Sequence, residues 1–353
     1  MPTKIGWTGE TWNPIIGCRA TSPGCKNCYA ARQAYRIPLL MRGRNPNATS
    51  VYDGLAKMTK GRVRWTGQFR YIPERLVETL RWQVGKRIFL GSMTDVCHPL
   101  VPHHWRLPIW AVMALTPRHT YQVLTKHPED MVRFYEWLTK GRQSDCLNRI
   151  INEAARIHDT WPGRRPAWLT QAVEDIDTWP LPNVEIGVTA EDQNTYDYRA
   201  RHLIQVPAAV RFFSLEPLLG PINLRLFDAL TDFDCYSLHE RIHGVIVGGE
   251  TGAGARPCEV SWVRHIVGQC DEAELNAYVK QLGRVVIDRN DAGFMGESET
   301  DWPDDTRHHD WTPFRAHYQG APVRIVLHNK AGADPEEWPR DLRRQDVPAR
   351  RAA

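Results

Sequence analysis

Residues 17–30, GCRATSPGCKNCYA, hold three cysteines within eleven positions: Cys18, Cys25 and Cys28. The gaps of six and two residues between them fit neither a helix nor a strand, and the glycines and proline of the stretch predict a bent loop that turns its sulfurs toward one centre. Three thiolates hold an iron–sulfur cluster while leaving one iron without a protein ligand, and such an iron is reactive. We therefore expect the rest of the fold to enclose this loop and the group that it binds.

A structural zinc ion is the alternative occupant of the loop. Zinc in such sites takes four ligands, and Cys97 or His98 would complete the set. The chain has eight cysteines, which in a reducing compartment are expected as ligands or buried thiols rather than as disulfides. Structural roles are predicted for the five outside the loop: Cys97, Cys146, Cys235, Cys258 and Cys270.

The composition is that of a soluble globular protein with one substantial core, since 353 residues are 42% hydrophobic and 24% charged. No uncharged apolar run approaches the roughly 20 residues that span a bilayer. The N-terminus, MPTKIGWTGETW, lacks the apolar core of a signal peptide. A cytoplasmic protein with no membrane partner is therefore expected.

The net charge of +4 permits a nucleic-acid partner without requiring one. The stretch from Arg32 to Arg70 interleaves basic and aromatic side chains, which predicts either a groove for phosphates and stacked bases or a solvated insertion with ordinary aromatic anchors. Its members are Arg32, Arg36, Arg42, Arg44, Lys57, Lys60, Arg62, Arg64 and Arg70, with Tyr35, Tyr52, Trp65 and Phe69.

A repeated pattern of a short β-branched or aromatic run, a polar turn and a helical segment predicts alternating strands and helices. The predicted strands are Arg87–Gly91, His119–Leu124, Val184–Val188, Arg211–Leu215, Gly244–Val247 and Ala277–Lys280, with a first strand near Lys4–Trp7. The predicted helices include Trp105–Leu115, Pro128–Thr139, Thr195–Gln205 and Ser261–Cys270. This alternation predicts an α/β fold with a parallel sheet, as a complete or partial (β/α) barrel, and a doubly wound open sheet is the alternative.

Polar residues follow most of these strands directly. They are Ser92, Thr94 and Asp95; Thr125 and Lys126; Thr189, Glu191 and Asp192; Glu216; and Gly248, Gly249 and Glu250. In a parallel barrel the carboxyl ends of the strands share one mouth, so these residues and the cysteine loop are expected to converge on one cavity. Each of them alone is also explained as a helix N-cap or turn residue.

Four regions interrupt the pattern or follow it. We expect a barrel over 1–283 with a basic insertion at about 37–80 and a polar surface insertion at about 141–182. A C-terminal insertion or lid packed on the barrel is predicted for 284–330. The segment 331–353, rich in Pro, Arg, Asp and Glu, is expected to be a flexible tail.

Seven motifs from Lys4 to Gly283 resemble, in their order, the phage-associated three-cysteine-motif family related to radical SAM enzymes. They are WTGETWNPIIGCRATSPGCKNCYAAR, FLGSMTDVCHP, YQVLTKHPE, EIGVTAEDQ, FFSLEPLLGPI, VIVGGETGAGARP and VKQLG. The family occurs in phages and in prophage regions of bacteria. The chain departs from the usual radical SAM pattern, because six residues stand where three are commoner between the first two cysteines and Tyr29 follows the third cysteine.

The resemblance implies a barrel of radical SAM type with a [4Fe–4S] cluster on Cys18, Cys25 and Cys28. S-adenosylmethionine (SAM) would chelate the fourth iron, and an external electron donor would reduce the cluster. By the same resemblance the SAM, ribose and substrate sites would be lined by Ser92, Thr94, Asp95, Thr189, Glu191, Glu216, Gly249 and Glu250. The GGE of Gly248–Glu250 lies late in the chain, so the turn Ser92–Asp95 is the counterpart of the usual early-strand motif.

The expected activity is reductive cleavage of SAM to a 5′-deoxyadenosyl radical that abstracts a hydrogen atom. The phage context indicates nucleic acid as substrate, with rearrangement of a hypermodified thymine in phage DNA, so that it resists host restriction, as one such reaction. A tRNA base, a small metabolite or a partner protein are the alternative substrates. The alternative function is a nucleic-acid-binding protein braced by a cluster or zinc, without catalysis, and no catalytic residue is assigned.

Overall fold

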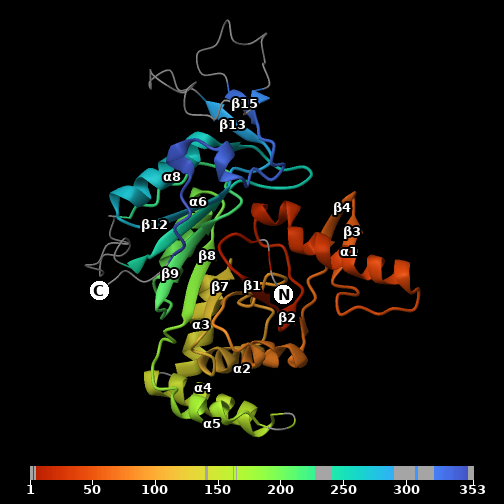
Figure 1. Cartoon of the computed structure of the whole chain (residues 1–353), viewed down its shortest axis with the longest axis vertical. Coiled ribbons are helices and arrows are strands. Elements are labelled where there is room, and N and C mark those ends of the chain that lie inside the picture. Colours follow the sequence, from red (N-terminus) through yellow and green to blue (C-terminus); the bar gives the residue numbers. More distant parts are fainter. Residues whose placement is uncertain are drawn as a thin grey trace, which may run out of the picture. The chain divides into compact units, whose positions relative to one another are not determined.

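The computed structural model describes residues 3, 5–139, 142–161, 163, 165–226, 241–289, 307–308 and 322–348. The chain divides into two compact units, each of which combines parallel strands with helices (Figure 1). Residues 1–188 with 202–210 form the first unit, and residues 189–201 with 211–353 form the second.

Four parallel strands make the sheet of the first unit, in the order β1-β6-β7-β8. They are β1 (Glu10–Trp12), β6 (Arg87–Leu90), β7 (Thr120–Thr125) and β8 (Val184–Thr189). Their residues are almost continuously buried, as expected for parallel strands that are covered on both faces.

Helices of the first unit include α2 (His103–Ala114), α3 (Pro128–Thr139), α4 (Gln143–Asp159) and α5 (Ala167–Glu174). Helix α4 packs against α2 and α3. It does so through apolar residues spaced three or four apart, Cys146, Ile150, Ala154 and Ile157, which are buried. The region expected as a polar surface insertion is therefore mainly two helices, and the charged residues between these positions hide the pattern in the sequence.

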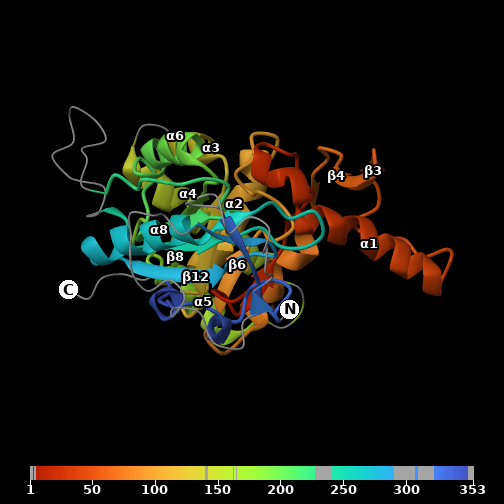
Figure 2. The same ribbon diagram turned by 90° about the horizontal axis from the view of Figure 1, so that it is seen from above.

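The region expected as a basic insertion at about 37–80 is ordered around α1 (Tyr29–Arg44) and a β-hairpin (Figure 2). The hairpin consists of β3 (Ala56–Thr59) and β4 (Arg62–Trp65). The chain continues through β5 (Arg70–Tyr71), which pairs with β2 (Ile15–Ile16), and the 3-10 helix η2 (Pro73–Arg81). A further 3-10 helix, η1 (Pro23–Asn27), precedes α1.

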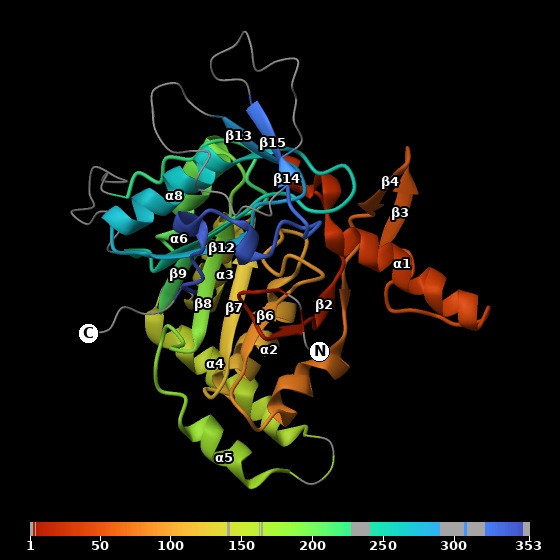
Figure 3. The ribbon, with the colours of Figure 1, turned by 45° about the horizontal axis from the view of Figure 1, so that its top comes forward.

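The second unit has three parallel strands in the order β9-β10-β12. They are β9 (Val210–Leu215), β10 (Gly244–Gly248) and β12 (Asn276–Gln281), with helices α6 (Gln193–Leu203) and α8 (Val260–Glu272). A second sheet has the order β11-β13-β15-β14 (Figure 3). Its strands are β11 (Cys258–Glu259), β13 (Val286–Arg289), β15 (Pro322–Val326) and β14 (Arg307–His308).

The predicted α/β class with parallel strands is confirmed by the four parallel strands of the first unit and the three of the second. Six predicted strands and four predicted helices lie within about two residues of the observed ones at each end. The first strand was predicted wrongly near Lys4–Trp7, since Lys4 lies outside the described residues and Trp7 lies in a turn. Strand β1 forms instead where Glu10, Thr11 and Trp12 pair with β6.

The C-terminal segment was expected to be a flexible tail, but it is folded as far as residue 348. It forms the 3-10 helices η3 (Pro335–Glu337) and η4 (Arg340–Leu342) and runs along the edge of β12. The backbone of Arg344 accepts a hydrogen bond from Val279 at 2.8 Å, and Asp346 donates to Ala277 at 3.1 Å. Trp338 and Leu342 are fully buried, so two apolar anchors outweigh the charged composition that predicted mobility.

Four of the five cysteines outside the loop are buried, as predicted for structural thiols: Cys97, Cys146, Cys258 and Cys270. Cys235 lies outside the described residues. Among the residues that the structure describes, no helix combines the length and the apolar character needed to cross a membrane.

Replacing Trp338 with alanine should lower the free energy of unfolding by about 3–5 kcal/mol, because it empties a fully buried site in the C-terminal segment. Urea denaturation of the full chain measures this loss, with Arg340→Ala at an exposed neighbouring position as the control. An unchanged midpoint for Trp338→Ala would show that Trp338 is not a buried anchor of this segment.

Glu185 carries a buried charge in β8 and pairs with Arg87 of β6 at 2.6 Å. Burial, only partly offset by Arg87, raises its pKa from 4.5 to about 7. The folded chain therefore holds the carboxyl proton of Glu185 more tightly than the unfolded chain does. The resulting stability is complete below pH 4.5 and is lost as the pH rises through 7.

We expect the free energy of unfolding of the wild type to fall, relative to that of Glu185→Gln, by up to about 3 kcal/mol between pH 4.5 and pH 8. The glutamine variant has no proton to lose, so it isolates this residue. Urea unfolding at several pH values measures both proteins. Parallel pH profiles would contradict the raised pKa.

Candidate functional site

The cysteine loop (residues 17–28) begins at a glycine that the backbone requires. Gly17 has a φ of +93°, and a Cβ at this position would collide with the carbonyl oxygen of Gln68. Its N–H donates to the carbonyl oxygen of Met93 at 3.1 Å. The start of the loop is thus fixed between the chain after β6 and the chain before β5.

The turn after β6 supplies further anchors. The hydroxyl of Thr94 donates to the carbonyl oxygen of Gly17 at 2.6 Å, one residue before Cys18. Ser92 exchanges hydrogen bonds with the side chain of Asn13 at 3.0 and 3.3 Å, and its carbonyl oxygen accepts from the Tyr29 hydroxyl at 2.9 Å. Both residues were predicted as SAM or substrate ligands, and in the structure they hold the ends of the cysteine loop.

Asp95 has the same kind of role. One carboxylate oxygen accepts from the Cys97 N–H at 3.0 Å and the Thr125 hydroxyl at 2.7 Å, and the other accepts from the Lys126 N–H at 2.8 Å. Three donors to one buried carboxylate bind the turn after β6 to the turn after β7. The predicted meeting of Ser92, Thr94 and Asp95 with the cysteine loop is therefore observed in the first unit.

The three thiols lie near one another. Cys18 has its pKa raised first by burial and then by the negative charges of Asp95, Cys28 and Cys25, an effect that requires these groups to be neighbours. All three cysteines are partly exposed residues, whereas the other described cysteines are buried. Partial exposure thus distinguishes the three loop thiols from the other described cysteines, and their joint use as ligands stays a prediction.

Cys25 has surroundings that favour its ionised form. Burial raises its pKa, but Lys126, the Thr21 N–H and Ser22 act in the opposite direction, so the pKa lies below its usual value. The Thr21 N–H lies 3.4 Å from the sulfur, and Lys126 donates to the Ser22 hydroxyl at 2.9 Å. A lysine from the end of β7 thus balances negative charge on the loop.

A histidine after β7 also supports the loop. His127 Nε2 lies 2.9 Å from the Thr21 hydroxyl, and its Nδ1 lies 3.2 Å from Glu129. His127, Glu129 and Asp130 each offer a ligand atom within 4.8 Å of the others. Because both ring nitrogens of His127 are engaged and Asp130 accepts from Arg133 at 3.1 Å, we interpret the cluster as a hydrogen-bonded network.

Cys97 and His98, the expected fourth ligands of a zinc site, have other partners. Cys97 is buried with its sulfur 3.7 Å from that of Met131. His98 Nδ1 accepts from the Leu100 N–H at 3.1 Å, and the ring packs against Phe69 and His127. Burial and His127 lower the pKa of His98 to about 4, so the imidazole is neutral at pH 7.

In the second unit, Gln281 at the end of β12 links residues that directly follow β9 and β10. Gln281 donates to Glu216 at 3.2 Å and to the carbonyl oxygen of Gly249 at 3.1 Å. Glu216 also accepts from Ser214 at 3.1 Å and pairs with Lys280 at 2.9 Å. The predicted residues Glu216 and Gly249 therefore lie together.

The other predicted carboxylates are neutralised inside this unit. Glu191 is fully buried and pairs with Arg199 at 2.9 Å, and Arg199 also donates to the carbonyl oxygen of Thr189. Glu250 accepts two guanidinium hydrogen bonds from Arg256, at 2.9 and 2.7 Å. Asp192 accepts from the N–H of Thr195 at 2.9 Å, as an N-cap does.

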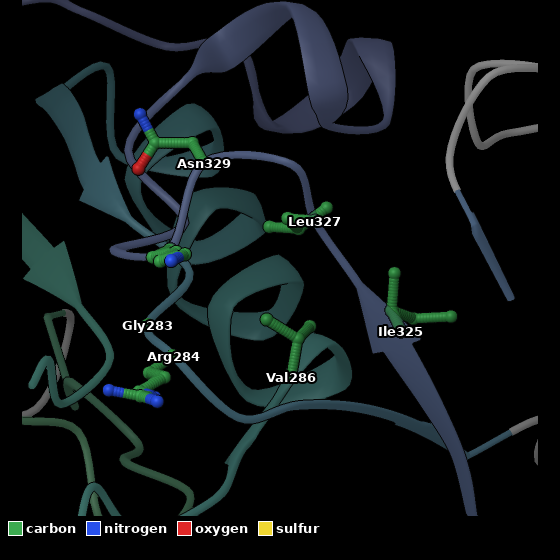
Figure 4. A pocket seen from close by; sticks show the side chains of 7 residues that line it. Gly283, Arg284, Val286, Ile325, Leu327 and Asn329 are labelled. Atoms are coloured by element: carbon green, nitrogen blue, oxygen red, sulfur yellow. The ribbon is translucent and has the colours of Figure 1, made fainter. Parts of the chain in front are cut away.

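The glycine pair after β10 packs against backbone. A Cβ at Gly249 would collide with the carbonyl group of Leu282, and one at Gly283, where φ is +95°, would press on Gly249. Glycine is thus required at both positions because backbone segments of the chain approach each other closely there. Gly283 also lines a hollow of about 140 Å³ with Val286, Leu327 and others, and Figure 4 shows Ile325 across it from Asn329.

Sequence reasoning missed several residues of these clusters. They are Thr21, Ser22, His127 and Glu129 in the first unit, and Lys280, Gln281 and Arg256 in the second. A signal was present, because His127 and Gln281 directly follow or end strands in the motifs YQVLTKHPE and VKQLG.

Comparisons with known proteins give one family and two similar structures. The family model described as "Protein of unknown function (DUF5131)" matches residues 2–330. No curated protein matches the sequence. Two point mutants of spore photoproduct lyase are similar in structure, each 10% identical and covering 90% of this chain and 68% of that chain, with TM-scores of 0.34 and 0.33.

Replacing Thr94 with valine should loosen the start of the cysteine loop, because it removes the hydroxyl that holds Gly17. The lost hydrogen bond is worth about 1 kcal/mol, or a roughly fivefold shift toward an open loop. Alkylation of Cys18, followed by mass spectrometry, should accelerate by that factor.

Thr139→Val is the matched control, since the Thr139 hydroxyl bonds only within its own helix. Equal alkylation rates for Thr94→Val and the wild type would show that Thr94 does not hold the loop.

Proposed function

We propose that this chain, which belongs to the DUF5131 family of proteins of unknown function, is an iron–sulfur enzyme of radical SAM type. Cys18, Cys25 and Cys28 would hold a [4Fe–4S] cluster. The observation that carries the proposal is the group of three partly exposed cysteines on one loop, whose start is held by Thr94 and Met93. Of the candidates for a fourth protein ligand, Cys97 is buried beside Met131, and Nδ1 of His98 accepts from the Leu100 N–H.

The spacing of the thiols favours a cluster over a single ion. Four sulfurs around one zinc ion lie about 3.8 Å from one another, given Zn–S bonds of about 2.3 Å. In the described part of the chain, the group of ligand atoms that converges within 4.8 Å is that of His127, Glu129 and Asp130, and the loop cysteines form no such group. The loop sulfurs are therefore not gathered as closely as the ligands of one zinc ion would be.

A cluster with three protein ligands leaves one iron for SAM. When bound, the cluster would pass an electron from an external donor to SAM, and a C–S bond of SAM would then break to give methionine and a 5′-deoxyadenosyl radical. This radical would take a hydrogen atom from the substrate. Lys126 beside Cys25 would offset the negative charge that the thiolates and sulfides bring. Asp95 and Thr94 would keep the loop closed around the cluster.

The assignment of the strand-end residues of the second unit stays a prediction. Among Thr189, Glu191, Glu216 and Glu250, the carboxylate of Glu216 is the best candidate for a ligand contact, because its side chain and that of Lys280 are 12% and 25% exposed, whereas Glu191 is fully buried. A partly exposed carboxylate–ammonium pair complements the amino and carboxylate groups of an amino acid such as the methionine part of SAM.

For the substrate we propose a base in DNA. The support is the resemblance of the motifs to phage-associated radical SAM-like proteins, and the reaction proposed is the rearrangement of a hypermodified thymine in phage DNA that makes it resist host restriction. Such a reaction needs the base to leave the stack and enter a pocket.

Anaerobic reconstitution with iron and sulfide, followed by SAM and dithionite, tests the activity. We expect 5′-deoxyadenosine from the wild type and none from Cys18→Ala, Cys25→Ala or Cys28→Ala. Cys97→Ala is the matched control, because its thiol is a buried neighbour of Met131 rather than a loop ligand, and it should retain the cluster absorbance and the product.

Two results would contradict the proposal. One is uptake of a single zinc ion with no cluster and intact SAM, which would favour the nucleic-acid-binding protein without catalysis. The other is loss of the bound metal in Cys97→Ala together with the three loop variants, which would make Cys97 a fourth ligand and close the open iron position.

A further inference from the structure

The positive charge of the chain is concentrated in one stretch. Residues 11–73 contain eleven Lys and Arg residues and a single acidic residue, Asp53, a net charge of +10 against +4 for the whole chain. Asp53 pairs with Arg42, so its charge is already matched within this stretch. Such an asymmetry points to an anionic partner.

The hairpin of β3 and β4 carries four of these cations at its tip. The strands pair with the register Lys57 to Arg64 and Thr59 to Arg62. Lys60 and Gly61 form the two-residue turn with φ values of 48° and 72°, as tight hairpin turns require.

The register separates the side chains into two faces. Partners that lie opposite each other point to the same side of a hairpin, and successive residues alternate. One face therefore holds Ala56 and Trp65, which pack on the apolar cluster that includes Ala30 and Ala34 of α1. Helix α1 contacts both strands, and Figures 2 and 3 show them alongside it.

The opposite face is cationic and exposed. It holds Lys57, Arg62 and Arg64 with Thr59, and Lys60 extends it at the turn. These four cations form no ion pair within the described part of the chain. Lys57 and Arg64 are cross-strand neighbours with Cβ atoms about 5 Å apart, an arrangement of like charges that is unfavourable without an anion between them.

From these observations we infer that the face formed by Lys57, Thr59, Arg62 and Arg64 binds the phosphate backbone of a nucleic-acid strand. Arg62 and Arg64 are two residues apart on one strand, a distance of about 6.7 Å that is comparable to the separation of consecutive phosphates along a nucleic-acid strand. Arginine offers a planar fork of donors that suits phosphate oxygens. This face would position the strand without reading its sequence.

A nucleic acid fits this face better than a lipid surface does. A membrane-binding face combines cations with apolar side chains that enter the bilayer. Here the apolar side chains of the hairpin lie on the other face: Ala56 and Trp65 pack against the core, and Met58 and Val63 follow them toward the turn, with Met58 50% exposed. On the cationic face itself the neighbour of the cations is the polar Thr59.

The inference deepens the proposed function, on which its choice of DNA as ligand rests, and it is tested apart from the cluster chemistry. Fluorescence anisotropy of a short labelled DNA strand and its duplex measures binding to the full chain before iron or SAM is added. We compare the wild type with Lys57→Gln/Arg62→Gln/Arg64→Gln between about 50 and 200 mM salt.

The triple variant should bind at least about tenfold more weakly, and its plot of log K against log salt should be less steep by about 2–3, since each lost phosphate contact removes about 0.7–0.9. For the single variant Arg64→Gln, the plot of log K against log salt should be less steep by about 0.7–0.9, the contribution of one phosphate contact. The control, Arg81→Gln/Lys330→Gln/Arg340→Gln, removes three exposed cations elsewhere and should leave the slope nearly unchanged.

Wild-type binding by the hairpin triple variant would overturn the inference. Equal losses in both triple variants would also overturn it, because they would show an effect of net charge alone. A third contrary result is binding to anionic phospholipid vesicles without binding to DNA. If DNA binding changes as expected but no deoxyadenosine forms, the proposed radical SAM chemistry is wrong, and the inference that this face binds nucleic acid is still supported.

Discussion

The hydrogen bonds of one turn, residues 92–95 after β6, hold the first unit's site together. Thr94 fixes the carbonyl oxygen of Gly17, and Asp95 fixes the chain after β7 through Thr125 and Lys126. Within the loop, only the 3-10 helix η1 (Pro23–Asn27) has regular hydrogen bonding of its own, so the residues before it depend on such partners. The position of the three thiols, the coupling of Cys18 with Asp95, and the approach of Lys126 to Cys25 all follow from this turn.

The two units handle polar groups at strand ends in different ways. In the first, the residues after β6 and β7 orient a loop whose thiols stay partly exposed and available. In the second, Glu191 and Glu250 are satisfied by Arg199 and Arg256, which removes the cost of burying their charges. Polar residues after parallel strands are therefore not equivalent. Some build the scaffold, and a partly exposed pair such as Glu216 with Lys280 remains suited to a ligand.

The sequence predicted the parts of this protein that depend on local pattern. Six parallel strands were found because their apolar runs are continuous and bounded by polar turns, and the cysteine loop because its spacing is incompatible with regular structure. Helix α4 and the packed C-terminal segment were missed because their apolar residues are separated by charges, and only tertiary contacts with α2 and β12 show which face is buried. The structural roles of Ser92, Thr94 and Asp95 were missed for a similar reason, since each depends on partners about 30 to 80 positions away.

The central claim is that the cysteine loop holds a [4Fe–4S] cluster with one iron left for SAM. Electron paramagnetic resonance of the reconstituted, dithionite-reduced protein with and without SAM tests this most directly, because it reports on the cluster irons themselves. The account predicts a reduced [4Fe–4S] signal whose shape changes when SAM is added. A signal that SAM leaves unchanged, or a protein that binds zinc and gives no cluster signal, would contradict it.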